Sequence, residues 1–464
     1  MQHMRSRVFT LLGQIIVLLA ACACALGSGT FVTKAALLSG LLLLFLLLCL
    51  RKDSARNCVY FGAAAWFLMM VYQYNFLDKT NDLFEGFQAD SQWLVIHGIN
   101  GVYQNKAAAN ASYGLFINDA LTPYSSQVGL QGHLYRLASR LTKLFLSAER
   151  AEELLQLGCS LLMGVVACGI VWLLYKKYGK LLAGTFYAVF CLSPWVVNFA
   201  RNLYWVEFTW FLPMLIGLVC VVYGHSRSMT AAAFAAIFLK CLCGYEYISS
   251  IMLGLILFPV VEWVVCLAGR DRAGARRWFW CVFRLGCAAL AGFAAALCLH
   301  ALLRGEGSLL TGLKIIYEQD VLRRTFGGDA AVLGEVYRES LEASIWQTVS
   351  RYFDFGVYFS TQVILGIDGN LFTPMVLCAA AAALWLRKEA DGVRNLALYL
   401  FSAMIPLSWM VLAKAHSYVH VHMNFVLWYM GFVPVCLYLI AKAVVHGLRQ
   451  YEAAQTGETA GVCK

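Results

Sequence analysis

Residues 230–267 read TAAAFAAIFLKCLCGYEYISSIMLGLILFPVVEWVVCL. This apolar stretch is too long for one upright membrane-spanning helix and too short for two full ones, because a span needs about 20 mostly apolar residues. We therefore interpret it as a helical hairpin that turns at Cys243-Gly244, with Lys240 and Glu246 close to the turn. A broken apolar run with charges at its break is typical of helical membrane proteins, where such groups pair or line a cavity.

The rest of the 464-residue chain has the same character. It is 61% hydrophobic and 13% charged, with a mean hydropathy of +0.67, whereas a soluble chain is roughly half apolar and a quarter charged. We expect an all-α, polytopic helical membrane protein with about 12 transmembrane segments. These segments are residues 8–26, 31–50, 58–76, 154–175, 181–199, 207–223, 230–243, 245–267, 278–302, 371–387, 395–413 and 424–446.

Lysine and arginine crowd the short loops on one side of this arrangement, for example at Arg51, Lys176 and Arg270. By the positive-inside rule these loops and both termini are cytoplasmic. The net charge of +10 is then a topology signal, and no nucleic-acid partner is expected. A cleaved signal peptide is the alternative for the first segment, but a second apolar segment close behind favours a retained hairpin. The expected location is the inner (plasma) membrane of a bacterium.

This topology divides the chain into three parts. They are an N-terminal transmembrane hairpin with a basic inner loop (1–57), a transmembrane core with long outer loops at 77–153 and 303–370 (58–446), and a cytoplasmic tail (447–464). The 17 cysteines fall almost entirely within the predicted spans, without disulfide or zinc spacing.

The first outer loop contains two amphipathic stretches, residues 82–99 and 127–147, which we expect to be helices on the membrane surface. Asp90 lies in the first of them, in the sequence NDLFEGFQADS at 81–91. An acceptor hydroxyl needs a positioned carboxylate to take its proton, so Asp90 is the candidate general base. Glu85 is the fallback, and Gln88 is a candidate substrate ligand.

Three further polar clusters lie at the predicted outer turns. Arg201 can hold a lipid phosphate with two parallel hydrogen bonds, and Lys414 with a protonatable histidine suits phosphate. His416 and His420 have the i, i+4 spacing of one helix face, but no acidic ligand lies adjacent, which disfavours a metal site. The substrate-binding candidates in these clusters are Arg201, Tyr204, Glu207, Lys240, Tyr245, Glu246, Lys414, His416 and His420.

Many spans, short basic inner loops and a long first outer loop with an early acid resemble the GT-C glycosyltransferases. The resemblance covers the span pattern of residues ~58–450, without a strict motif. It implies an all-helical fold, a polyprenyl-phosphate- or diphosphate-linked sugar donor, and a catalytic acid at Asp90 or Glu85. Arg201, Lys240, Lys414 and His416 would hold the donor phosphate. In that family the acidic loop usually follows the first span, whereas here it follows the third, so an extra N-terminal hairpin would precede the core.

The residues themselves, taken without this resemblance, predict the same class of enzyme. The inner loops are too short for a nucleotide-sugar domain, and no Walker-type glycine loop is present, so the donor must arrive through the membrane. We expect transfer of a sugar to a cell-envelope glycan or lipid acceptor, without a firm cofactor and with a divalent cation left open. The alternatives are an oligosaccharide polymerase or ligase that uses lipid diphosphate sugars, a transporter or flippase, and a structural assembly subunit.

Overall fold

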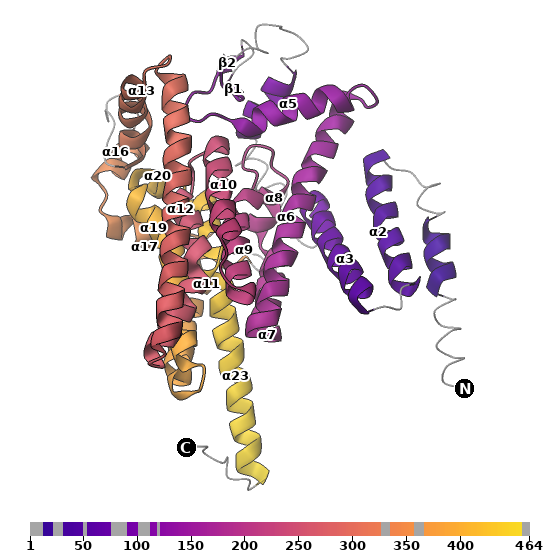
Figure 1. The fold of residues 1–464 in the computed structure, drawn as a ribbon, viewed down its shortest axis with the longest axis vertical. Coiled ribbons are helices and arrows are strands. Elements are labelled where there is room, and N and C mark those ends of the chain that lie inside the picture. The colour runs from indigo at the N-terminus through magenta and orange to yellow at the C-terminus, as the bar shows by residue number, and fades with distance from the viewer. Residues whose placement is uncertain are drawn as a thin grey trace. The chain divides into compact units, whose positions relative to one another are not determined.

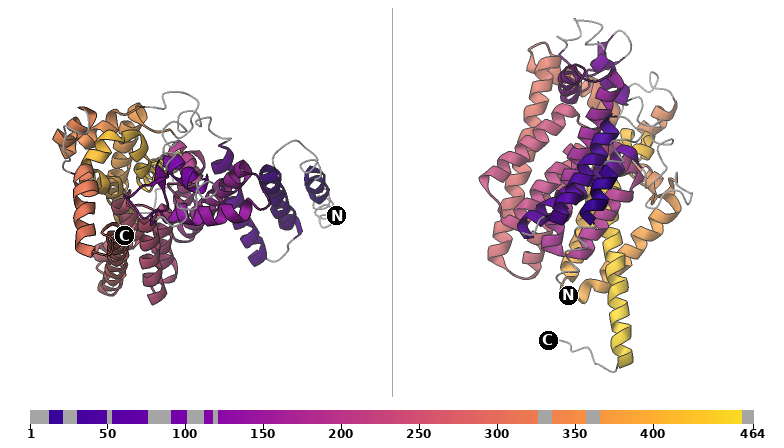
Figure 2. Two further views of the ribbon diagram at one scale, coloured as in Figure 1. Left: turned by 90° about the horizontal axis from the view of Figure 1, so that it is seen from above. Right: turned by 90° about the vertical axis from the view of Figure 1, so that its right-hand side faces the viewer.

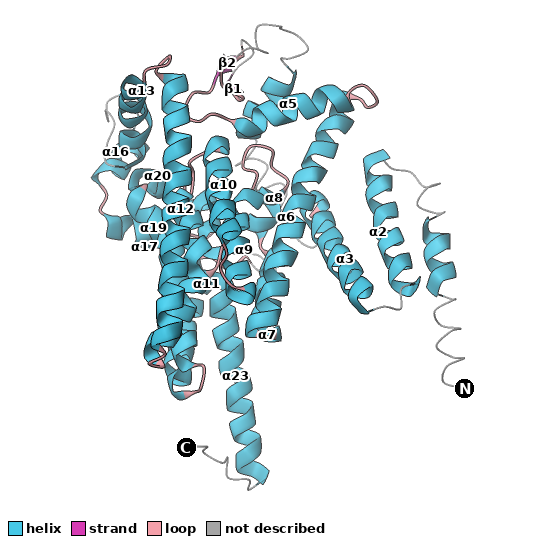
Figure 3. Ribbon diagram, in the orientation of Figure 1, coloured by secondary structure: helices cyan, strands magenta, loops and turns pink. Residues whose placement is uncertain are grey.

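The computed structural model describes residues 13–21, 31–49, 53–75, 91–100, 112–117, 121–325, 335–356 and 366–456. Over these residues the chain is overwhelmingly helical, which confirms the all-α class (Figure 3). One short antiparallel pair occurs in this described part, in which β1 (Phe116–Ile117) pairs with β2 (Thr122–Pro123), with Phe116 opposite Pro123.

The chain folds into two compact units, which are described separately here. The first contains Met1–Tyr124, Leu130–Gly169 and Val197–Phe208. The second contains Ser125–Gly129, Ile170–Val196 and Thr209–Lys464.

The first unit is built on apolar helices that pack through small residues. Its helices are a segment at 13–21, α2 (Phe31–Cys49), α3 (Asp53–Tyr74), a segment at 91–100, α5 (Leu130–Thr142) and most of α6 (Ala148–Tyr178). Gly40 of α2 lies directly against the Trp66 ring of α3, and a Cβ at Gly164 of α6 would meet the Ala65 carbonyl at 2.6 Å. Small residues of this kind let helix backbones approach closely in membranes.

The predicted helix at 127–147 is present as α5, which runs across the direction of α6 (Figure 1). Its leucine stripe is exposed, with Leu137 at 58% and Leu141 at 60%. This exposed stripe is what a helix on a membrane surface presents to lipid. Of the predicted helix at 82–99, the structure describes a helix at 91–100.

The second unit contains Ser125–Gly129, the end of α6 and the first part of a broken helix, whose last residues, 197–200, belong to the first unit. Here α7 (Lys180–Leu192) and α8 (Pro194–Ala200) are bent by 64° at their junction. The following helices are α9 (Phe208–Tyr223), α10 (Arg227–Cys243), α11 (Ile248–Ala268) and α12 (Arg272–Arg304). The predicted break at Cys243-Gly244 is confirmed, since α10 ends there. However, α12 packs along both α10 and α11. A Cβ at Gly292 of α12 would meet the Phe234 carbonyl of α10 at 2.5 Å.

The predicted second outer loop is largely helical. It contains α13 (Leu309–Ile316), a π-helical turn η2 (Tyr317–Val321), α14 (Leu322–Thr325), α16 (Glu335–Glu342) and α17 (Ile345–Asp354). The remaining elements are α18 (Gly369–Trp385), a 3₁₀ turn η3 (Leu386–Lys388), α19 (Gly392–Leu412), α20 (Lys414–Val419), α21 (Val421–Asn424), α22 (Val426–Tyr429) and α23 (Phe432–Thr456).

The last predicted span, 424–446, differs from the structure. Helix α23 begins at Phe432 and continues to Thr456, extending beyond its neighbours (Figure 2). Residues 421–429 form short helices instead, because their aromatic rings are packed inside the unit. The Phe425 ring stacks on Trp195 at 4.8 Å between centroids, and Trp428 packs edge-on against Phe372 at 4.9 Å.

Six helices in the described part of the chain are long and apolar enough to cross a membrane, so this is a multi-pass membrane protein. They lie at Ala148–Tyr178, Ile248–Ala268, Arg272–Arg304, Leu371–Lys388, Gly392–Leu412 and Phe432–Gln455. The bent pair α7–α8 adds a seventh if it counts as one span. A total of about 12 stays a prediction.

A charge network joins the helix ends of the second unit on the side of the predicted cytoplasmic loops. The Glu262 carboxylate on α11 lies 3.0 Å from Lys177 Nζ and 3.5 Å from Arg394 Nε. Asp391 pairs with Arg394 at 2.7 Å and with Lys442 at 3.4 Å. The network therefore connects α6, α11, α19 and α23. Some of the basic residues used to predict the topology, such as Lys177 and Arg394, thus also stabilise the packing of these helices.

Candidate functional site

The candidate site lies at the break between α10 and α11. Tyr247, just before α11, has φ 64° in the left-handed region, a conformation that L-residues seldom adopt and that is common at functional sites. Lys240 is buried, and its Nζ donates a 2.7 Å hydrogen bond to the Gly244 carbonyl that ends its own helix. Glu246 is buried as well, and its carboxylate lies close above Gly244 together with the Gln127 amide oxygen.

Arg324 of α14 completes this cluster. Its guanidinium lies 3.6 Å from the Glu246 carboxylate, and the two side chains are only 16% and 7% exposed. An ion pair this well buried interacts more strongly than a surface pair, because water screens it less. Arg324 was not predicted as a site residue; it ends the mixed-charge segment Tyr317–Arg324, which is helical here.

Side-chain contacts from α12 hold the π-helical turn η2 in place before α14. Arg304 at the end of α12 forms an ion pair with the Asp320 carboxylate, and it donates to the Gln319 side chain at 2.6 Å. Asp320 is itself buried. These contacts fix η2, and η2 in turn sets where Arg324 projects.

The histidines lie close to Arg324. Helix α14 packs against α20, and the His416 and His420 rings have centroids 4.6 Å apart, as their spacing predicted. The His422 ring is 5.9 Å from that of His420. Burial and then the positive charge of Arg324 lower the pKa of His420, while burial and His420 lower the pKa of His422 to about 4. Both imidazoles are therefore neutral near pH 7.

Lys414, a predicted phosphate ligand, has backbone partners in the structure. Its Nζ donates to the Leu341 carbonyl at 2.8 Å and also to the Ala343 carbonyl, at the end of α16. The amine thus satisfies carbonyls that a helix end leaves without partners. Burial lowers the pKa of Lys414. A phosphate would have to displace these hydrogen bonds.

Tyr245 lies on the α12 side of the break. Its hydroxyl donates to the Ala296 carbonyl at 3.3 Å, and its ring stacks on His300 at 5.6 Å between centroids. The His300 Nε2 lies 3.0 Å from the Ser125 carbonyl. Tyr245 is therefore anchored to α12, and its hydroxyl faces protein backbone.

The predicted cluster at 201–207 belongs to the first unit. The Arg201 guanidinium donates to the Gln73 carbonyl at 3.1 Å, and the Tyr204 carbonyl accepts from the Gln131 amide at 2.9 Å. Glu207 is fully buried, and within the described residues neither carboxylate oxygen has a hydrogen-bond partner. In the same turn, Trp205 Nε1 donates to Ser91 Oγ at 3.1 Å.

Asp90, Glu85 and Gln88 lie outside the described residues, so their predicted roles stay predictions. Ser91, which follows Asp90 in the chain, is the nearest described residue. No group of three or more His, Cys, Asp or Glu side chains that could hold a metal ion occurs within the described ranges.

No family model, curated protein or solved structure matches this chain. The chemistry of the site follows from its own geometry. Within the second unit, that geometry brings together Lys240, Glu246, Arg324, His416 and His420, from three segments far apart in the sequence.

Proposed function

We propose that this chain is a membrane glycosyltransferase that moves a sugar from a polyprenyl-phosphate-linked donor to a glycan or lipid acceptor at the outer membrane face. The observation that carries the proposal is Arg324, whose guanidinium lies 3.6 Å from the Glu246 carboxylate at the break between α10 and α11 and whose charge acts on the His420 imidazole. A guanidinium there can hold a phosphate while the lipid tail stays in the bilayer.

In the proposed reaction, Asp90 takes the proton of the acceptor hydroxyl, with Glu85 as the fallback. The hydroxyl oxygen forms a bond to the anomeric carbon of the sugar, and the bond from that carbon to the donor phosphate oxygen breaks. The phosphate leaves with the bonding electrons, and the resulting negative charge is stabilised by Arg324. Fixed cations aimed at developing charge are among the largest catalytic contributions.

Two contacts within the first unit support a role for the turn that carries Arg201. The Trp205–Ser91 hydrogen bond ties the segment that follows Asp90 to the turn that carries Arg201. The Arg201 side chain is itself held in place, because its guanidinium donates a hydrogen bond to the Gln73 carbonyl. Lys414 and Tyr245 have structural partners, so in this proposal they shape the site and do not hold the donor phosphate.

An oligosaccharide polymerase or ligase that uses a lipid diphosphate sugar is the second candidate. The central position of an arginine favours it, because such a mechanism depends on holding a diphosphate more than on a carboxylate base. The transporter reading receives less support, since transporters place ionisable groups near the bilayer midplane and the Lys240–Glu246 pair lies at helix ends.

The test uses the full-length protein in lipid nanodiscs and a photoreactive polyprenyl phosphate as the probe. Arg324→Gln is expected to reduce specific labelling about tenfold, because a charge-assisted hydrogen bond contributes about 1.5–3 kcal/mol. Arg338→Gln is the matched control, because Arg338 lies in the same predicted outer loop but is exposed and pairs with Glu342 at 3.3 Å. Equal labelling of the two variants would remove Arg324 from the proposal.

The catalytic acid is tested separately in the source organism. Asp90→Asn is expected to abolish a surface glycan while the protein level in the membrane stays normal. An unchanged glycan for Asp90→Asn and also for Glu85→Gln would exclude the carboxylate-dependent transferase. If Arg324→Gln loses the glycan while Asp90→Asn and Glu85→Gln both keep it, the result would instead favour the polymerase or ligase.

A further inference from the structure

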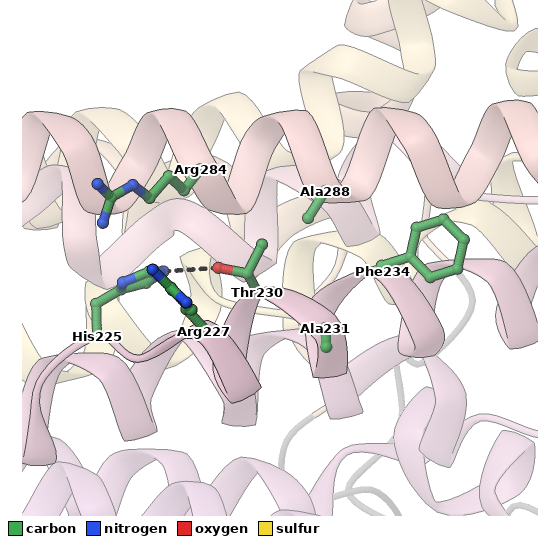
Figure 4. Close-up of a pocket in the computed structure, with 7 residues that line it drawn as sticks. All are labelled: His225, Arg227, Thr230, Ala231, Phe234, Arg284 and Ala288. Atoms are coloured by element: carbon green, nitrogen blue, oxygen red, sulfur yellow. Dashed lines mark hydrogen bonds between the residues drawn. The ribbon is translucent and has the colours of Figure 1, made fainter.

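A pocket lies between the first turns of α10 and the middle of α12, away from the break that carries the candidate site. Its volume is about 690 Å³, within the range of small-ligand sites. Figure 4 shows Arg284 and Ala288 on one wall, with His225, Arg227, Thr230, Ala231 and Phe234 opposite.

One end of this pocket is positively charged. Arg227 and Arg284 both line it, and within the described residues neither has an acidic partner. The third polar group, His225, has Nε2 2.9 Å from Thr230 Oγ1. The pocket end thus has two guanidinium groups without a protein anion, which is an arrangement suited to phosphate.

The other end is apolar. Phe234, Ala231 and Ala288 form its walls. The same helix α12 exposes large apolar side chains, with Phe283 at 51% and Leu290 at 61%, and it is long enough to cross a membrane. A polar end joined to an apolar end on a lipid-facing helix matches the shape of an amphiphile.

The position of Arg284 supports the same ligand. Arg284 lies six residues inside the apolar segment predicted at 278–302, or about 9 Å at about 1.5 Å per helical residue. An arginine at this depth is costly unless it reaches the interface or pairs with an anion. A lipid phosphate at the headgroup boundary supplies that anion.

We propose that this pocket binds an anionic phospholipid, with its phosphate between Arg227 and Arg284 and an acyl chain along Phe234 and Ala288. The apolar end selects a lipid over free inorganic phosphate. This site is separate from the Arg324 cluster and does not depend on the proposed transferase activity.

The experiment measures lipid retention on the purified full-length protein by native mass spectrometry. Phosphatidylglycerol and phosphatidylcholine with the same acyl chains are the probes, and the variant is Arg227→Gln with Arg284→Gln. Its control is Arg272→Gln with Arg276→Gln, which removes the same charge from exposed positions on α12 outside the pocket. Wild type and control are expected to retain phosphatidylglycerol at least tenfold better than the pocket variant.

Three results would overturn the proposal. These are equal retention of the two lipids by the wild type, equal losses in the pocket and control variants, and full displacement of phosphatidylglycerol by millimolar inorganic phosphate. Ala231→Phe keeps both arginines but fills the apolar end, and it is expected to weaken retention of the long-chain lipid. If it does not, the acyl chain lies elsewhere and the proposed binding mode is wrong, even if the arginine variant fails to fold.

Discussion

Replacing Glu262 by glutamine is expected to destabilise the second unit through the charge network at the ends of α6, α11 and α19. The carboxylate is 7% exposed and contacts both Lys177 and Arg394. Removing one partner of a buried ion pair costs about 3–5 kcal/mol. The Lys177 and Arg394 side chains are 31% and 27% exposed and regain some hydration, so about 2–3 kcal/mol is expected here.

The measurement is thermal unfolding of the full-length protein in detergent, followed by tryptophan fluorescence. The expected decrease in Tm is roughly 5–10 °C. Glu389→Gln is the matched control, because Glu389 is 47% exposed and pairs with His446 at 3.5 Å. An exposed pair of this kind contributes about 0–1 kcal/mol, so the Tm of the control is expected to stay close to that of the wild type.

A double-mutant cycle with Lys177→Met separates the ion pair from other effects of the substitution. Contacting charges couple by about 0.5–3 kcal/mol, whereas independent sites add. Equal Tm decreases in Glu262→Gln and Glu389→Gln, or a coupling energy near zero, would show that the network does not hold these helices together.

Three further predictions follow from the described contacts. Because burial lowers the pKa of His422 to about 4, its contribution to stability is complete above about pH 6.5 and is lost as the pH falls towards 4, so His422→Gln should flatten the decrease in Tm between pH 6.5 and 4. Gly292→Ala should lower Tm by more than Gly286→Ala, because a Cβ at Gly292 meets the Phe234 carbonyl while one at Gly286 meets nothing within 4 Å. Arg324→Gln should reduce the initial rate of transfer from a polyprenyl-phosphate sugar about 10²-fold, the scale for loss of one stabilising donor.

The fold class and the helix break could be predicted from the sequence because both depend on local patterns. The apolar runs and the interruption at Cys243-Gly244 are visible in the residues themselves, and so is the i, i+4 spacing of His416 and His420. The start of the last span could not be predicted, since the aromatic residues near Phe425 are as apolar in a packed core as in a lipid bilayer.

The site was harder to predict because its partners come from distant segments. Arg324 and Glu246 are separated by 78 residues, and only tertiary packing brings them together. The partners of Lys414 could not be predicted for the same reason, because sequence patterns do not show that the carbonyls of Leu341 and Ala343 lie next to its amine.

The π-helical turn at Tyr317–Val321 has a consequence for how this region tolerates changes in length. A π turn holds about one residue more than an α turn over the same rise, and each helical residue rotates the chain by about 100°. Because the π turn already accommodates the extra residue, deleting one residue there would restore an α turn and leave Arg324 facing Glu246, whereas inserting one would rotate Arg324 away by about 100°. Homologues that share this cluster should therefore accept one residue fewer between Arg304 and Arg324, with an α turn in place of the π turn, but not one residue more.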